Sequence, residues 1–128
     1  MVKGIEHLAV ISKDTDKIKD WYLKMFGGEV VYDNKKGTYF IAFPDKSMIE
    51  FIKSDIDNTE NELKTGGIRH IALGVSKEEF DSAVEKLRAE NVEVLTEVSE
   101  SASGIKTFFF RDIDGNILHL IYRPDPLV

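Results

Sequence analysis

Cysteine is absent from this chain. The absence excludes disulfide bridges, thiolate metal sites and cysteine nucleophiles, which leaves histidine and carboxylate side chains as the candidate metal ligands. Proline and glycine are sparse, with three and nine residues among 128, and this argues against long disordered tracts. A chain of this length can bury most of its apolar surface without cross-links, so we expect one domain that folds alone.

Positive charge and long apolar runs are scarce as well. The 17 lysines and arginines are outnumbered by 23 aspartates and glutamates, giving a net charge of −6, so nucleic acids and anionic membranes are unfavourable partners. No apolar run approaches the roughly 18 residues that span a bilayer, and the chain enters a strand pattern at Ile5 instead of a signal peptide. We therefore expect a cytoplasmic protein that binds neither nucleic acid nor membranes.

Short apolar segments between polar turns predict strands and two helices. The expected strands are residues 4–11, 29–32, 38–43, 47–52, 68–75, 92–95, 107–111 and 117–121. Apolar residues at helical spacing follow Thr15, and a second such stripe follows Ser76, which forms a capping box with Glu79. Between the halves, residues 54–67 indicate a connector with one helical turn near residues 60–64.

The two halves repeat each other. His7 and His70 lie 63 residues apart, and at this offset HLAV of the first half aligns with HIAL of the second. Further along, the offset becomes 69, which aligns Glu50 with His119 and assigns the six extra residues to a polar loop at residues 96–106. The self-similarity predicts an α+β fold built from two βαβββ modules. The expected modules are residues 4–53 and residues 68–122.

Polar residues interrupt the apolar strands at only two equivalent positions of each module. They are the three histidines of the chain and one glutamate: His7, Glu50, His70 and His119. Neutral imidazoles and a carboxylate that converge on a concave surface are typical ligands of a divalent metal, which is the interpretation we favour. The alternative is three unrelated core histidines and a glutamate neutralised by Arg69 or Arg111, because an unpaired buried carboxylate is costly.

Taken together, these features resemble the vicinal oxygen chelate superfamily, also called the glyoxalase/bleomycin-resistance/dioxygenase family. The resemblance rests on the βαβββ repeat, the histidine in the first strand of each module, Glu50 near the end of module one and the DIDGN turn at residues 112–116. It extends over essentially the whole chain. It implies a single domain, residues 1–128, whose modules form a cupped mixed sheet with the helices outside.

The resemblance also implies a cofactor and partners. In such proteins a divalent metal, here zinc, nickel, iron or manganese, chelates two neighbouring oxygens of a small-molecule substrate. Carried over by position, the metal ligands are His7, Glu50, His70 and His119. Lyase and epimerase members usually have glutamate at the last position, so His119 removes one of two opposed carboxylates. Members are often dimers, and a homodimer is implied here.

Three functions remain open. The first, which we favour, is a lactoylglutathione-lyase-like lyase or isomerase in which the metal polarises a carbonyl and Glu50 or His119 transfers a proton. The second is an iron-dependent oxygenase, since Glu50 and two histidines can form a two-histidine, one-carboxylate iron site. The third is a non-catalytic binder similar to bleomycin-resistance proteins. Such binders generally need no metal ligands, so the intact set of four argues against it.

Overall fold

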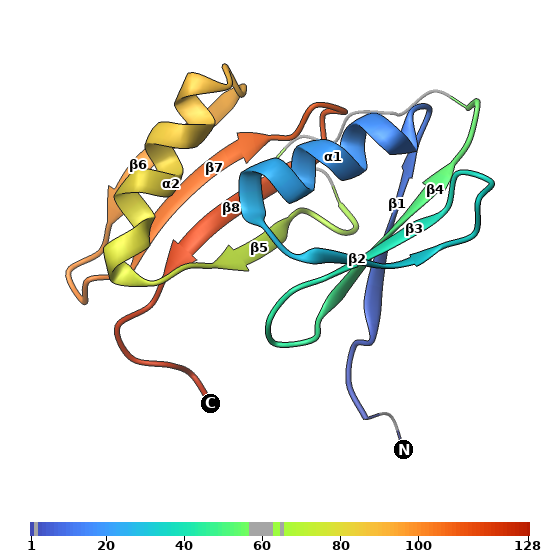
Figure 1. Ribbon diagram of the computed structural model, residues 1–128. Helices are drawn as coiled ribbons and strands as arrows, with labels where there is room; N and C mark the ends of the chain where they lie inside the picture. Colours follow the sequence, from blue (N-terminus) through green and yellow to red (C-terminus); the bar gives the residue numbers. More distant parts are fainter. Residues whose placement is uncertain (2, 57–62, 65) are drawn as a thin grey trace. The chain divides into compact units, whose positions relative to one another are not determined.

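The computed structural model describes residues 1, 3–56, 63, 64 and 66–128 of the chain. It divides into two compact units, Met1–Asn58 and Thr59–Val128. Each unit contains one four-stranded mixed sheet and one helix, so the predicted α+β fold of two tandem modules is confirmed (Figure 1). We call the elements of the first unit module one and those of the second module two.

Module one follows the order strand, helix and three strands. Its elements are β1 (His7–Ser12), α1 (Thr15–Phe26), β2 (Glu29–Asp33), β3 (Tyr39–Ala42) and β4 (Met48–Lys53). The sheet order is β1-β4-β3-β2, with β1 parallel to β4 and the other neighbours antiparallel. Helix α1 begins where the side chain of Asp14 accepts a hydrogen bond from the Lys17 backbone N–H. Its apolar stripe packs on the sheet, with the Tyr22 and Phe51 rings 5.0 Å apart.

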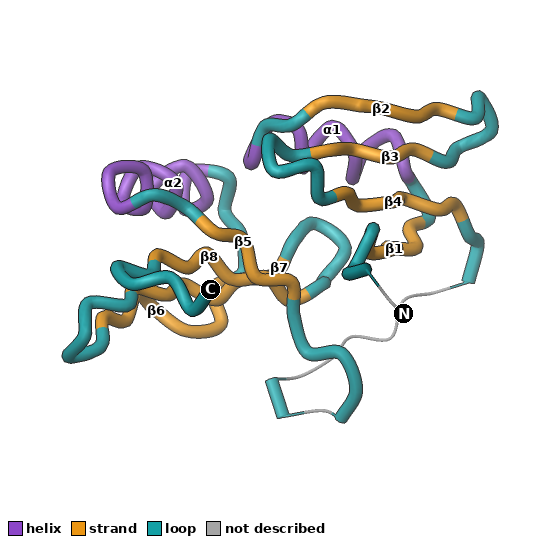
Figure 2. The backbone as a smooth tube through the Cα atoms, turned by 90° about the horizontal axis from the view of Figure 1, so that it is seen from below, coloured by secondary structure: helices purple, strands orange, loops and turns teal. Residues whose placement is uncertain are grey.

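Module two repeats this arrangement. Its elements are β5 (Ile71–Gly74), α2 (Lys77–Ala89), β6 (Val94–Glu100), β7 (Lys106–Arg111) and β8 (Ile117–Tyr122). The sheet order is β5-β8-β7-β6, and β5 runs parallel to β8. The Ser76 side chain accepts from the Glu79 backbone N–H at the start of α2, as the capping pattern predicts. In each module the helix lies against its own sheet, and the buried stripe of α2 is Phe80, Val84 and Leu87 (Figure 2).

Strand register reproduces the two sequence offsets. In module one Ala9 pairs with Glu50 across β1 and β4, and in module two Ala72 pairs with His119 across β5 and β8. On the other side, β3 places Phe40 opposite Glu50, and β7 places Phe109 opposite His119. Glu50 in module one and His119 in module two therefore occupy equivalent positions in their sheets.

Residues 96–106 differ from the sequence expectation. We predicted one polar loop, but residues 96–100 continue β6, with Ser99 opposite Thr107 and Glu100 opposite Lys106. The prediction was wrong there because the polar side chains of this edge strand are mostly exposed to solvent, so the segment lacks the apolar alternation of a half-buried strand. The six-residue insertion consequently lengthens a hairpin.

Two smaller outcomes concern the ends of elements. β1 begins at His7, so Ile5 lies outside the strand and is exposed, and β5 begins one residue after His70. The helical turn expected near residues 60–64 includes residues 60–62, which lie outside the described residues. Among the described residues, neither helix has the length and apolar character needed to cross a membrane.

Candidate functional site

The first two candidate residues lie together in module one. The Nε2 atom of His7 is 3.5 Å from the Glu50 Oε1 atom, and their side chains are 33% and 19% exposed. The other ring nitrogen, Nδ1, is 2.8 Å from a carboxylate oxygen of Glu6, which fixes the orientation of the imidazole. Phe40 presents its ring edgewise to His7 at 5.2 Å between centroids. The pair thus has a partly open face and an apolar neighbour.

The other two candidate residues lie together in module two and are more deeply placed. The rings of His70 and His119 have centroids 4.5 Å apart, and His119 is only 7% exposed. The Phe109 ring lies 4.4 Å from His119 and 5.4 Å from His70. In both histidines the Nδ1 atom is buried, and the described residues provide no hydrogen-bond partner for it. A core histidine bonded to a carbonyl through Nδ1 is therefore not what the structure contains.

Burial keeps the module-two imidazoles neutral. Burial, followed by the charges of His70 and Arg69, lowers the pKa of His119 to about 4. Burial also lowers the pKa of His70, again with a contribution from Arg69. Near neutral pH both rings therefore carry an unprotonated nitrogen, which is the form that binds a metal ion.

Two charged residues lie beside the pairs in roles that the sequence did not predict, although Arg69 was considered as a partner of Glu50. They are Glu6 and Arg69, each directly before the first histidine of its module and separated by the same offset of 63. The Arg69 guanidinium lies 5.2 Å from the Phe109 ring, and its Nε donates to the Leu63 carbonyl oxygen at 2.7 Å. Comparing charges at equivalent repeat positions could have found them.

The alternative interpretation requires an arginine partner for Glu50, and Arg111 was one of the two candidates. Its Nε is 3.0 Å from a Glu93 carboxylate oxygen, and its Nη1 donates to the Gly115 carbonyl at 2.7 Å. Glu50 Oε1 instead lies near His7 Nε2. Arg111 thus has a carboxylate partner in module two, and Glu50 has an imidazole partner in module one.

The donor set suits a divalent metal, although the structure shows it as two pairs. Three imidazoles and one carboxylate match the preferences of zinc, nickel, iron and manganese, and the unpaired ring nitrogens leave lone-pair donors available. Across the part of the chain that the structure describes, no group of three or more His, Cys, Asp or Glu side chains is placed to hold an ion. The four-ligand set and the catalytic roles of Glu50 and His119 therefore stay predictions.

Comparisons with known proteins point in one direction. The model of the Glyoxalase/Bleomycin resistance protein/Dioxygenase superfamily matches residues 4–120. Among curated relatives, the fosfomycin resistance protein FosX of Listeria innocua is 24% identical over 120 residues, covering 94% of this chain and 90% of its own length.

Solved structures share the fold. A FosX variant from Listeria monocytogenes, crystallised with Mn(II) and 1S,2S-dihydroxypropylphosphonic acid, aligns with a TM-score of 0.75 at 24% identity. The alignment covers 94% of this chain and 90% of that one. The oxidase ChaP-H2 aligns with a TM-score of 0.77 at 19% identity, covering 97% and 96% of the two chains. At these identities the structural likeness establishes the fold alone.

Proposed function

Because the chain belongs to the glyoxalase/bleomycin resistance protein/dioxygenase superfamily, we propose that it is a metal-dependent enzyme whose two polar pairs hold one divalent ion. The proposed ligands are His7, Glu50, His70 and His119. The observation that carries the proposal is the buried His70–His119 pair, which is held neutral and has an unpartnered Nδ1 on each ring. Zinc, nickel, iron and manganese all fit this donor set.

The reaction that we propose is a lyase or isomerase step with proton transfer at a carbon beside a carbonyl. When bound, the ion would supply Lewis-acid polarisation of the substrate oxygens. Glu50 is the only carboxylate of the set, and its side chain is partly accessible, so it can remove the proton. His119, with a pKa of about 4, accepts a proton much less readily near neutral pH and serves mainly to bind and orient.

Aromatic rings next to both pairs support a small substrate with an apolar part. Phe40 lies edgewise to His7, and Phe109 lies beside His70 and His119. Such rings exclude water from one side of a bound carbonyl compound, which strengthens electrostatic interactions with the polar groups on the other. We propose that they line the substrate-binding surface.

A second candidate function is the modification of a small phosphonate. It is favoured by the similarity to FosX, a fosfomycin resistance protein, one form of which was crystallised with a dihydroxypropylphosphonic acid. Incubating the Mn(II)-loaded chain with fosfomycin and following the phosphorus NMR spectrum distinguishes the two. Enzyme-dependent conversion to a new phosphonate supports the second function, and an unchanged spectrum supports the first.

Metal content tests the proposal most directly. Elemental analysis of protein purified without added metal or chelator should find zinc, nickel, iron or manganese, and His70→Ala should lose most of it. A matched control is available in Glu85→Gln, which lies on α2 outside both pairs and should keep the metal. If wild-type protein binds no divalent ion even after metal is added, the proposed function is wrong.

The centre can be completed by both modules of one chain or by modules of two chains in a homodimer. Mixing Glu50→Gln protein with His119→Ala protein separates these cases. In a centre shared between chains, a mixed dimer contains one site with both native pairs, so metal binding and activity return. Within one chain, every site keeps one substitution, and the mixture behaves as the average of its components.

A further inference from the structure

Module one contains a polar cavity at the start of α1 that the proposed reaction does not use. Its volume is about 590 Å³, within the usual range for small-molecule sites. It lies where the end of β1, the first turn of α1, the β2–β3 turn and the end of β4 meet. The lining residues that the argument uses are Thr15, Asp16, Asp33, Lys36, Gly37 and Lys53.

The cavity is on the opposite face of the sheet from His7 and Glu50. Side chains alternate along β4, so Lys53 shares a face with Phe51, which packs on α1, whereas Glu50 points to the other face. On β3, Tyr39 is opposite Phe51 and reaches α1, while Phe40 accompanies His7. A ligand in the cavity is therefore distinct from a substrate beside Glu50.

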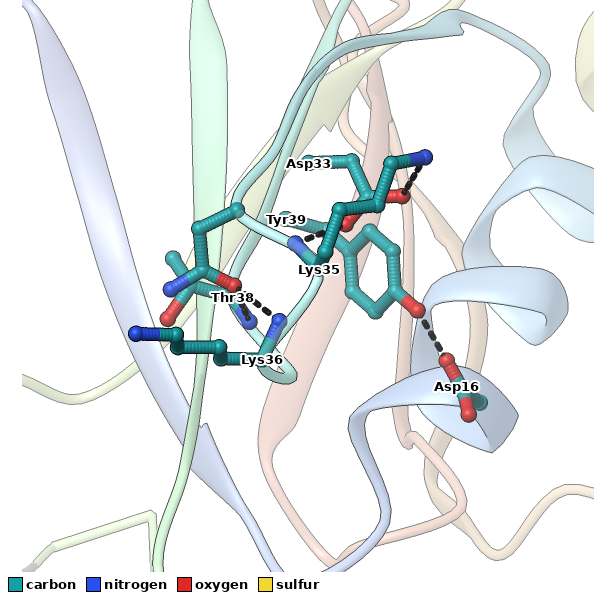
Figure 3. A network of polar contacts seen from close by, with 7 residues as sticks. Asp16, Asp33, Lys35, Lys36, Thr38 and Tyr39 are labelled. Atoms are coloured by element: carbon teal, nitrogen blue, oxygen red, sulfur yellow. Dashed lines mark hydrogen bonds and ion pairs between the residues drawn. The ribbon is translucent and has the colours of Figure 1, made fainter.

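Two carboxylates at the cavity already have donors (Figure 3). Asp33 accepts from the Lys35 backbone N–H at 2.7 Å and from its Nζ at 3.0 Å, and these hydrogen bonds lower the pKa of the carboxyl group. The Tyr39 hydroxyl donates to Asp16, and this hydrogen bond raises the pKa of Tyr39 to about 12. With Asp14, the cavity lining carries three carboxylates against four lysines, Lys13, Lys35, Lys36 and Lys53, so positive charge is in slight excess.

Two lysines remain with unpaired ammonium groups. Among the residues described, neither Lys36 nor Lys53 forms an ion pair, although the backbone N–H of Lys36 is fixed by Asn34 Oδ1 at 2.8 Å. Gly37 has φ +97°, and a Cβ there would lie 3.3 Å from Lys53 Cβ. The tight turn thus brings Lys36 and Lys53 to one cavity without a side chain between them.

The hydroxyl of Thr15 completes the set of donors. Thr15 is only 3% exposed and lines the cavity, yet the structure records no hydrogen bond for its hydroxyl within the described part of the chain. It stands at the first position of α1, where the helix dipole also favours negative charge. Ammonium groups, a hydroxyl and a helix start are the donors that proteins use for phosphate.

Module two shows that the fold does not need these residues. Thr15, the first residue of α1, corresponds to Lys77, the first residue of α2, and at the offset of 69 Lys53 corresponds to Tyr122. The same strands and helix form in module two without a threonine at the helix start and without a lysine at the end of the last strand. The basic and hydroxyl residues are therefore a property of module one and not a requirement of the βαβββ unit.

We propose that this cavity binds a phosphate group, either free phosphate or the phosphate of a small monoester, at a site separate from the metal ligands. Lys36 and Lys53 contribute charge, and Thr15 donates a hydrogen bond through its hydroxyl. The ligand is small because the cavity is bounded by the β2–β3 turn on one side and α1 on the other.

Titration of the full chain with inorganic phosphate, at constant ionic strength and followed by amide NMR spectra, tests the proposal. Saturable shifts should appear at Thr15, Asp16, Lys36 and Gly37. Lys36→Gln and Lys53→Gln should each weaken binding by about tenfold, because each removes one charge-assisted contact. A parallel titration with glycerol 3-phosphate identifies the source: tighter binding indicates a phosphate monoester, and equal or weaker binding indicates free phosphate.

The matched control is Lys77→Gln at the start of α2, the corresponding helix end of module two. It should leave the dissociation constant unchanged, and spectra of all variants should otherwise overlay that of wild type, which verifies folding. Shifts that do not saturate, or equal weakening by Lys77→Gln, would overturn the proposal. Because no step involves the metal, this result is independent of the proposed enzyme function.

Discussion

The two modules have the same strand order and register, but the residues at equivalent positions differ in charge and burial. In module one His7 lies between two carboxylates, Glu6 and Glu50, in a partly open setting. In module two the corresponding residues are an arginine and a second histidine, and both imidazoles are neutral and have a buried Nδ1. The repeated backbone thus determines the positions of the site residues, whereas the neighbouring residues determine their charge and proton affinity. The following experiments test that difference.

The largest expected effect comes from the single carboxylate of the set. Glu50→Gln should reduce lyase or isomerase turnover by about 100-fold or more, since it removes the proposed base, while much of the metal is retained by three histidines. Substrate turnover and elemental analysis of the same sample provide the two readouts. In the oxygenase alternative, the carboxylate balances the charge of the ferrous ion, and the same variant should lose metal and activity together.

The converse change makes the two modules more similar in sequence. His119→Glu places a carboxylate at the point equivalent to Glu50, which is the more usual lyase pattern, and a lyase should tolerate it. If Glu50→Gln keeps both its metal and full turnover, the base is His119 and the roles assigned here are reversed.

The next effect concerns stability and tests whether both pairs bind the same metal ion. A divalent ion at about 1,000 times its dissociation constant should raise the free energy of unfolding by about 4 kcal/mol, because the unfolded chain lacks the assembled site. Thermal unfolding with metal and with chelator measures the gain. His7→Ala and His70→Ala should each abolish it. A gain that survives one of these substitutions would assign the metal to a single module.

A smaller effect should distinguish the modules in metal-free protein. Burial, with the charges of His70 and Arg69, lowers the pKa of His119 from 6.5 to about 4, so in this interval the unfolded chain binds a proton that the folded chain does not. The free energy of unfolding should therefore fall by roughly 3 kcal/mol as the pH drops from 6.5 to 4. Denaturant unfolding across this range measures it. His119→Gln should flatten the profile, and His7→Gln should leave the decline in place.

The smallest effect is expected from Arg69. Its positive charge contributes to the lowered pKa of His70 and His119, after burial. Arg69→Gln should raise both pKa values slightly, as read from imidazole proton NMR titrations of metal-free protein. Arg123→Gln is the matched control and should change neither. Equal shifts in the two variants would remove Arg69 from the explanation.

Much of the fold could be predicted because each element has a local signal. Helix α1 is read from an apolar stripe after Asp14, and the repeat follows from constant offsets, which the register then confirms. Residues 96–100 could not be predicted as strand, because their strand conformation depends on pairing with β7, and the exposed segment has no apolar alternation of its own.

The candidate residues could be located from sequence, but their surroundings could not. The repeat offsets give the strand positions of His7 and His119, whereas the burial of His119 depends on packing against Phe109 of the neighbouring strand β7. The contacts of Glu6 with His7 and of Arg69 with Phe109 were not predicted, because an exposed charge before a strand is common. Which atoms pair is a property of tertiary packing.

The position of β8 has a consequence for how the protein matures during synthesis. β8 is made after every other strand of module two, yet it lies inside the sheet between β5 and β7. As the chain leaves the ribosome, module one can fold while β5 and β7 still lack the strand that joins them. The His70–His119 pair therefore forms only when β8 inserts, so a nascent chain arrested before Ile117 has a complete His7–Glu50 pair and no counterpart to it.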